Sequence, residues 1–141
     1  MTKNDISALK HSLMDYNYYK SRIDRCRQRL SEIDILIEEM AYPRMYYGER
    51  LYERDPYKTL FDTERYSELN DERGVLEDEL KFCIFAVKRV DNLLEGMDEP
   101  LRSMLIDIYI KGMPVSAVAR KYYYSDEKSI HRYVRKELSK M

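Results

Sequence analysis

Basic and hydrogen-bonding side chains recur near the C-terminus at a spacing suited to contact with a polyanion. On one face of a helix expected after residue 126 lie Lys128, Ser129, His131, Arg132, Arg135 and Lys136. On its other face lie Ile130, Tyr133, Val134 and Leu138. A helix with an apolar back and a basic front can pack on its neighbours while entering the major groove of DNA. The pattern predicts a recognition helix, with double-stranded DNA as its partner.

The candidate DNA-binding residues of this helix and of the segment before it differ in their expected roles. Lys128, Ser129, Arg132 and Lys136 are expected to approach base edges and phosphates, while Arg135, Lys121 and Arg120 contact the DNA backbone. His131 could donate to a phosphate or a base edge, or be a solvated surface histidine. The alternative for Arg132, Arg135 and Lys136 is an ordinary basic C-terminal turn, favoured by the helix dipole.

Two shorter helices are expected ahead of this one. Asp98 or Glu99 can cap a helix over about residues 100–111, and Gly112 suits the left-handed residue that follows a helix. Its apolar stripe is Leu101, Met104, Leu105, Ile108 and Tyr109, and its opposite face carries Arg102, Asp107 and Lys111. Pro114 can begin the second helix, and Asp126 can cap the third.

With these residues, segment 97–141 resembles the region-4 type helix-turn-helix of sigma factors, and more closely the small phage transcription regulators of the ArpU and RinA kind. The similarity lies in Tyr109 and Gly112, in Val118 and Ala119, and in residues 129–133. This chain departs from the pattern at residues 122–124, three tyrosines where a leucine-glycine type ending is usual. The resemblance implies a phage or prophage regulator that activates late genes, with RNA polymerase as a further candidate partner.

The upstream region predicts two long helices, over about residues 5–40 and 62–94. The first has apolar rows Leu9, Tyr16, Ile23, Leu30, Ile37 and Tyr19, Cys26, Ile33, Met40. The second has Leu69, Leu76, Cys83, Val90 and Tyr66, Leu80, Val87, Leu94. Rows that repeat every seven residues are typical of coiled coils. We expect an antiparallel hairpin, pairing with another chain, or both.

A tyrosine-rich break, residues 41–57, separates these helices. It contains Pro43, Gly48 and Pro56, and therefore predicts a loop or a broken helix. One interpretation makes its tyrosines and arginines a contact surface for polymerase, DNA or another subunit. The other has the tyrosines cap the end of the hairpin, with solvated arginines.

Charge is distributed unevenly along a chain whose net charge is only −1. Residues 97–141 hold nine Lys or Arg against six Asp or Glu, whereas residues 1–96 hold sixteen against twenty. The sign therefore changes where the expected DNA-binding domain begins. A footprint this modest predicts weak, salt-sensitive binding by one copy, which a homo-oligomer formed through the N-terminal helices would strengthen.

Other classes find little support. No apolar run approaches the ~20 residues of a membrane span and no signal sequence is recognisable, so we expect a cytoplasmic protein without a membrane partner. Cys26, Cys83, His11 and His131 lack the close spacing of zinc ligands, so neither a metal nor another cofactor is expected. Four glycines and no phosphate-binding loop or nucleophile motif argue against an enzyme.

The sequence thus predicts an all-α protein: a long antiparallel helical hairpin or coiled coil over residues 1–96, followed by a three-helix helix-turn-helix domain over residues 97–141. The expected function is sequence-specific DNA binding in transcription regulation. One alternative is a phage terminase small subunit, which would form a large ring and bind a packaging site. The other is a polymerase- or sigma-binding adaptor whose C-terminal helices bind protein instead of DNA.

Overall fold

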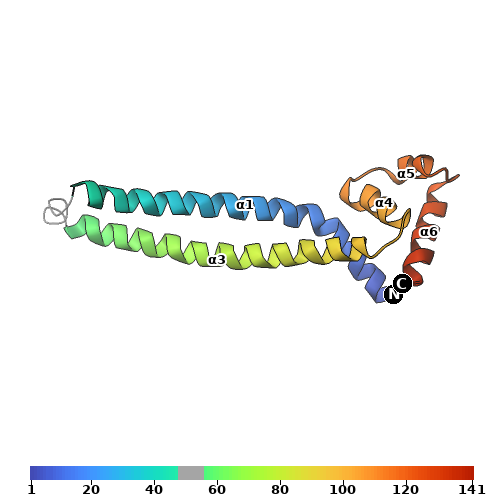
Figure 1. Ribbon diagram of the computed structural model, residues 1–141, viewed down its shortest axis with the longest axis horizontal. Coiled ribbons are helices and arrows are strands. Elements are labelled where there is room, and N and C mark those ends of the chain that lie inside the picture. The colour runs from blue at the N-terminus through green and yellow to red at the C-terminus, as the bar shows by residue number, and fades with distance from the viewer. Residues whose placement is uncertain (48–55) are drawn as a thin grey trace. The chain divides into compact units, whose positions relative to one another are not determined.

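The computed structural model describes the backbone of residues 1–47 and 56–141, and the side chains of residues 1–40 and 63–141. Every regular element in the described part is a helix, as the sequence predicts (Figure 1). In chain order these are α1 (Lys3–Tyr47), α3 (Pro56–Glu95), α4 (Leu101–Leu105), the π-helix η1 (Ile106–Ile110), α5 (Val115–Lys121) and α6 (Glu127–Ser139). The protein is therefore all-α over these residues.

The long helices extend further than expected. α1 continues through Pro43 to Tyr47, and α3 begins at Pro56 instead of near residue 62. The predicted break at 41–57 was therefore too wide, since residues 41–47 and 56–57 belong to helices. Its tyrosines and arginines lie outside the described side chains: Tyr42, Tyr46, Tyr47, Tyr52, Tyr57, Arg44, Arg50 and Arg54.

α1 begins two residues earlier than expected because Thr2 and Asp5 cap it reciprocally. The Asp5 amide donates to the Thr2 hydroxyl at 3.1 Å, and the Thr2 amide donates to the Asp5 carboxylate at 3.0 Å. The two bonds satisfy amides that the first helical turn leaves without partners. Residues 3 and 4 consequently join the helix.

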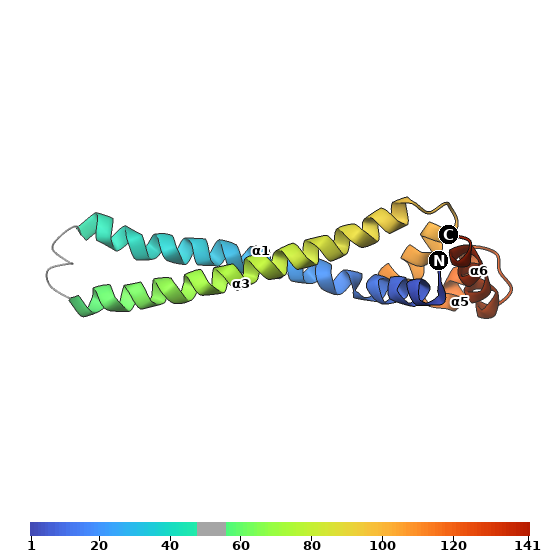
Figure 2. The same ribbon diagram turned by 90° about the horizontal axis from the view of Figure 1, so that it is seen from below.

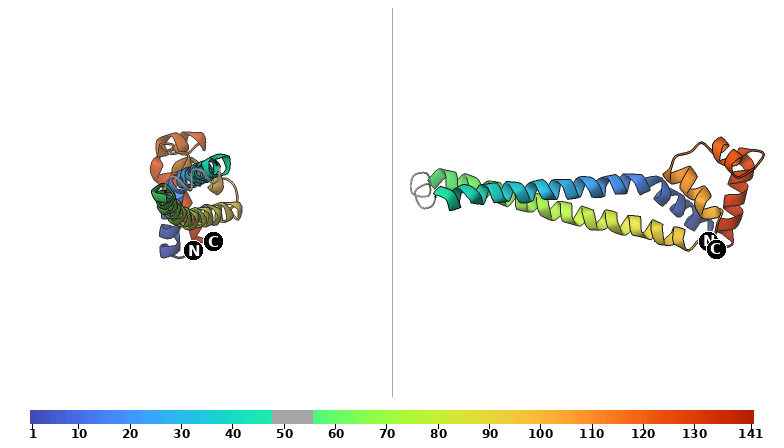
Figure 3. Two further views of the ribbon diagram at one scale, coloured as in Figure 1. Left: turned by 90° about the vertical axis from the view of Figure 1, so that its left-hand side faces the viewer. Right: turned by 45° about the horizontal axis from the view of Figure 1, so that its top comes forward.

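The chain forms two compact units. The first, the terminal unit, combines Met1–Lys20 with Ile84–Met141; the second, the middle unit, is Ser21–Cys83. Both ends of the chain belong to the terminal unit, and the Met1 ammonium donates to the Met141 carbonyl. Three views mark the two ends close together (Figure 1, Figure 2 and Figure 3).

In the middle unit, α1 and α3 run antiparallel and bury apolar residues between them. Arg22 bonds Glu79 at 2.7 Å and Arg29 bonds Glu72 at 2.6 Å, so partner numbers on α3 fall as those on α1 rise. Among the side chains described in this unit, the buried ones are Ile23, Cys26, Ile33, Leu69 and Cys83. Because ion pairs this exposed contribute at most about 1 kcal/mol, apolar burial dominates the stability of the pairing.

The predicted rows are buried in part. The buried members are Leu9, Tyr16, Ile23, Cys26, Ile33, Leu69, Cys83, Val87, Val90 and Leu94, and the half-buried members are Tyr19, Leu30, Ile37, Met40, Leu76 and Leu80. Tyr66, expected on the second row of α3, is 47% exposed. Cys26 and Cys83 belong to the apolar rows and are free, buried thiols, as expected. Burial raises the pKa of both thiols, and the Glu79 charge adds to the effect, so both are held protonated at neutral pH.

We expect Leu69→Ala to destabilise the protein by about 2–5 kcal/mol, because Leu69 is 1% exposed and its truncation leaves a cavity. Ile35→Ala, in the same unit at 55% exposure, is the matched control and should change stability by less than about 0.5 kcal/mol. Urea unfolding followed by circular dichroism measures both. Equal losses in the two variants would contradict the burial of Leu69 between α1 and α3.

Candidate nucleic-acid interface

α4 and η1 provide the base on which the other C-terminal helices rest. The Glu99 carboxylate accepts the Ser103 amide at 3.3 Å and Arg102 Nε at 2.9 Å, so Glu99 stabilises the first turn. The helix starts at Leu101, not at residue 100 as expected. Leu101, Met104 and Leu105 are buried, as predicted, and α6 packs against α4.

The end of this helix differs from the prediction. Residues 106–110 form a π-helix in which the Lys111 amide donates to the Ile106 carbonyl at 2.8 Å. The wider turn changes the register of the helix faces. Ile108 and Tyr109, expected in the core, are only partly buried, and Asp107, expected on the solvent face, is 1% exposed. The 3.6-residue period was therefore the wrong guide over this turn.

Asp107 is the one buried charged residue in the described part of the chain, and it is fully partnered. Its Oδ2 accepts Lys121 Nζ at 2.8 Å and the Tyr122 hydroxyl at 3.0 Å, and Lys111 Nζ lies 3.6 Å from Oδ1. Burial raises the pKa of Asp107, but the bonds from Lys121 and Tyr122, with both lysine charges, outweigh it and lower the pKa below its usual value. The ionised carboxylate thus ties η1 to the end of α5.

Turns with left-handed residues lie on both sides of α5. Gly112, before α5, has φ +67°, as its predicted place after a helix requires, and Val118 and Ala119 of α5 are buried. Tyr123 also has a positive φ, +63°, and is 97% exposed. Tyr124 instead packs against Tyr133, with ring centroids 5.9 Å apart. Of these two tyrosines, Tyr123 is thus the more accessible to a partner.

α6 has an apolar back and a basic front. Asp126 caps it as predicted, accepting the Ser129 amide at 2.8 Å and the Ser129 hydroxyl at 2.7 Å. Ile130, Val134 and Leu138 are buried against α4 and α5. Tyr133, also expected inward, is partly buried. The helix therefore presents its other face to solvent.

Two of the eight predicted DNA-binding residues already have partners. Lys121 pairs with Asp107, and the Ser129 hydroxyl is bonded within the cap. The other six are exposed and make no ion pair among the described residues: Arg120, Lys128, His131, Arg132, Arg135 and Lys136. Five of these six lie on α6, and Arg120 lies at the end of α5.

The first turns of α1 contact the C-terminal helices, which the sequence did not reveal. Asn17 Nδ2 donates to the Ile110 carbonyl at the end of η1, at 2.7 Å. The Tyr16 hydroxyl donates to Asp91 of α3 at 2.8 Å, and burial, with this bond and the Asp91 charge, raises the pKa of Tyr16 to about 12. Both bonds join residues more than 70 apart, so no local signal could have predicted them.

Metal-binding clusters and membrane-spanning helices are absent from the part of the chain that the structure describes. There, no group of three or more His, Cys, Asp or Glu side chains is arranged to hold a metal ion. No helix in those ranges is long and apolar enough to cross a membrane. Comparison with protein-family models, curated proteins and solved structures finds no match to this chain.

We expect Asp107→Asn to lower stability at neutral pH by about 1–3 kcal/mol, because it removes charge-assisted bonds to Lys121 and Tyr122. Since folding lowers the pKa of Asp107, the ionised form stabilises the protein above pH 3.8, and this contribution is lost as the pH falls through the folded-state pKa. The stability difference between the two proteins should therefore shrink in acid. Urea titrations across a pH series measure it.

Asp98→Asn supplies the control for this prediction, because Asp98 is an exposed carboxylate that lies just before α4. It should leave stability at neutral pH nearly unchanged. A wild-type advantage over Asp107→Asn that grows as the pH falls would contradict the assignment of Asp107 as an ionised, stabilising group.

Proposed function

We propose that this protein is a sequence-specific DNA-binding regulator of transcription, of the phage or prophage late-gene activator type. In this proposal α5 and α6 are the helix-turn-helix, and α1 and α3 form an antiparallel hairpin that serves oligomerisation or partner contact. The resemblance of residues 97–141 to ArpU- and RinA-like regulators suggests the biological role. RNA polymerase is a further candidate partner.

The observation that carries the proposal is the division of α6 into two faces. Its apolar back is buried on α4 and α5, so the helix is held rigidly. Its front presents five basic or hydrogen-bonding side chains without intramolecular ion pairs in the described chain. Unpaired cations on a rigid helix can bind phosphates and base edges without first breaking internal contacts.

The bonds of Asp107 also support the proposal that α5 and α6 form a helix-turn-helix. By engaging Lys121 and Tyr122 it fixes the end of α5 and the start of the turn that leads to α6. A helix that reads base edges must be held in a defined pose relative to the helix before it. Lys121 then acts chiefly in positioning, which leaves backbone contacts to Arg120 and Arg135.

We expect the purified protein to bind fragments of its own genomic neighbourhood selectively, with an affinity that falls steeply as salt rises. Arg132→Ala should weaken that binding about tenfold or more, since one good bidentate base contact contributes about 1–3 kcal/mol. Fluorescence anisotropy over a salt series measures both effects.

Lys88→Ala, which removes one exposed lysine from α3, is the control of equal charge and should bind like the wild type. Circular dichroism should show unchanged helix content in both variants, because Arg132 and Lys88 are exposed. If the wild type binds no DNA even at low salt, the adaptor alternative replaces the proposal.

In this proposal the apolar rows of α1 and α3 pack against each other within one chain, so self-association uses another face of these helices. Val75 and Phe82 lie seven residues apart on α3, which places them on the same side of that helix, and they are 68% and 61% exposed. We expect sedimentation to show a dimer or a larger homo-oligomer of the 17.1 kDa chain. Val75→Glu should shift the mass toward that of the single chain, whereas Lys81→Glu, an exposed change on the same helix, should not.

A further inference from the structure

The start of α1 and the second half of α6 form a basic groove in the terminal unit. The groove has a volume of about 500 Å³ and is lined by Met1, Lys3, Ile6, Ser7, Lys10, Arg135 and Ser139. Ile6, 8% exposed, supplies an apolar floor. Three cationic side chains and two hydroxyls thus surround one opening, and no acidic side chain of the described chain lines it.

The groove residues share helix faces. Lys3, Ser7 and Lys10 recur at intervals of four and three residues, so they lie on one face of α1. Arg135 and Ser139 are likewise four apart on α6. Lys3 and Lys10 stand about 10 Å apart along the helix axis, far enough to contact separate phosphates.

None of the three cations is neutralised from within the described chain. Lys3, Lys10 and Arg135 make no ion pair there, although other exposed cations of the molecule do, such as Lys140 with Glu137 at 3.3 Å. The nearby Asp5 carboxylate is occupied in capping Thr2. The groove therefore keeps its positive charge.

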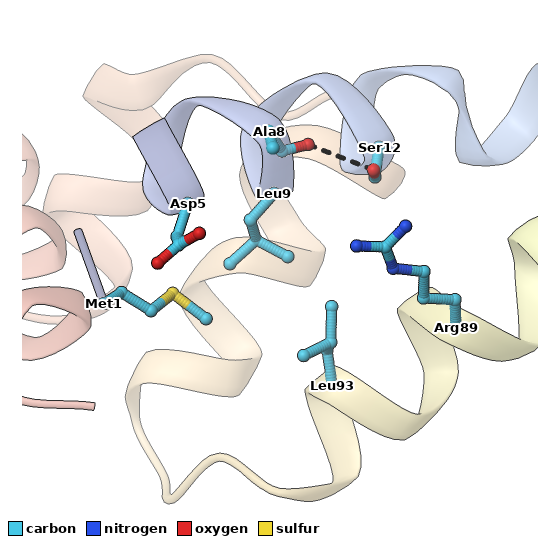
Figure 4. Close-up of a pocket in the computed structure, with 7 residues that line it drawn as sticks. All are labelled: Met1, Asp5, Ala8, Leu9, Ser12, Arg89 and Leu93. Carbon is cyan, nitrogen blue, oxygen red and sulfur yellow. Dashed lines mark hydrogen bonds between the residues drawn. The ribbon is translucent and has the colours of Figure 1, made fainter. Parts of the chain in front are cut away.

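A second hollow in the same unit provides a contrast (Figure 4). It is smaller, about 260 Å³, and combines the Arg89 guanidinium with the Asp5 carboxylate and the apolar side chains of Leu9 and Leu93. Its mixed charge does not suit a polyanion. The basic groove is thus distinguished by charge, and not merely by shape.

Arg135 links the groove to the basic front of α6. It lies seven residues after Lys128 and three after Arg132, so the front continues along α6 into the groove. We propose that Lys3 and Lys10 of α1, together with Arg135, form a phosphate clamp that holds the DNA backbone next to the segment read by α6. This inference rests on the proposed function and assigns part of the DNA-binding surface to the N-terminal helix.

The test compares the full-length protein with the double variant Lys3→Ala, Lys10→Ala on a short labelled duplex of arbitrary sequence. Removing two phosphate contacts should weaken binding equally on all sequences and reduce the slope of log affinity against log salt by about 2. Lys3→Arg, Lys10→Arg should restore the slope, because arginine keeps the charge. Fluorescence anisotropy from low to moderate salt provides the slopes.

The matched control is Lys81→Ala, Lys88→Ala, which removes the same charge from α3 outside the groove. If both double variants change the slope equally, the clamp is overturned while the proposed function stands. If the wild type binds no duplex at all, the proposed function fails and the clamp fails with it. If inorganic phosphate raises the melting temperature of the wild type but the slope of the Lys3, Lys10 variant is unchanged, the groove holds a free anion and the clamp is again overturned.

Discussion

The C-terminal helices depend on one buried charge. Asp107 lies in an apolar setting where an unpaired carboxylate would be strongly unfavourable, and its bonds to Lys121 and Tyr122 make that position tolerable. The same bonds restrict where α5 can end and where the turn to α6 begins. Because α6 packs on both α4 and α5, its exposed face inherits this geometry. A polar contact in the interior thereby determines which side chains the surface presents.

The first part of α1 also contacts the C-terminal helices. Asn17 binds the last carbonyl of η1, a group that the end of a helix would otherwise leave to solvent. The start of α1 also lies beside α6, where the cations of Lys3 and Lys10 line the same groove as the guanidinium of Arg135. Residues 1–20 carry a net charge of +1, so the basic surface is broader than the C-terminal sequence alone indicates.

Local signals allowed much of the helical order to be predicted, while contacts across the chain were missed. The all-α class follows from apolar periodicity, and the cap at Asp126 and the left-handed Gly112 follow from residue type. The burial of Asp107 could not be predicted in this way, because it depends on a π-helical turn that no residue pattern indicates and on two partners fourteen and fifteen residues away. The sequence did not predict a role for Lys3 and Lys10 for a similar reason, because Arg135, which lines the same groove, is more than a hundred residues distant in sequence.

The composition of the terminal unit also bears on the order in which the protein folds during synthesis. Its segments Met1–Lys20 and Ile84–Met141 are separated by the whole middle unit. A growing chain can pair residues 21–47 of α1 with the first part of α3 as soon as residues 21–83 have left the ribosome, whereas the contacts of residues 1–20 with η1 and α6 must await those later helices. A message cut short before residue 127 would therefore yield a paired α1 and α3 without α6. Only a chain translated through α6 would carry both halves of the basic surface.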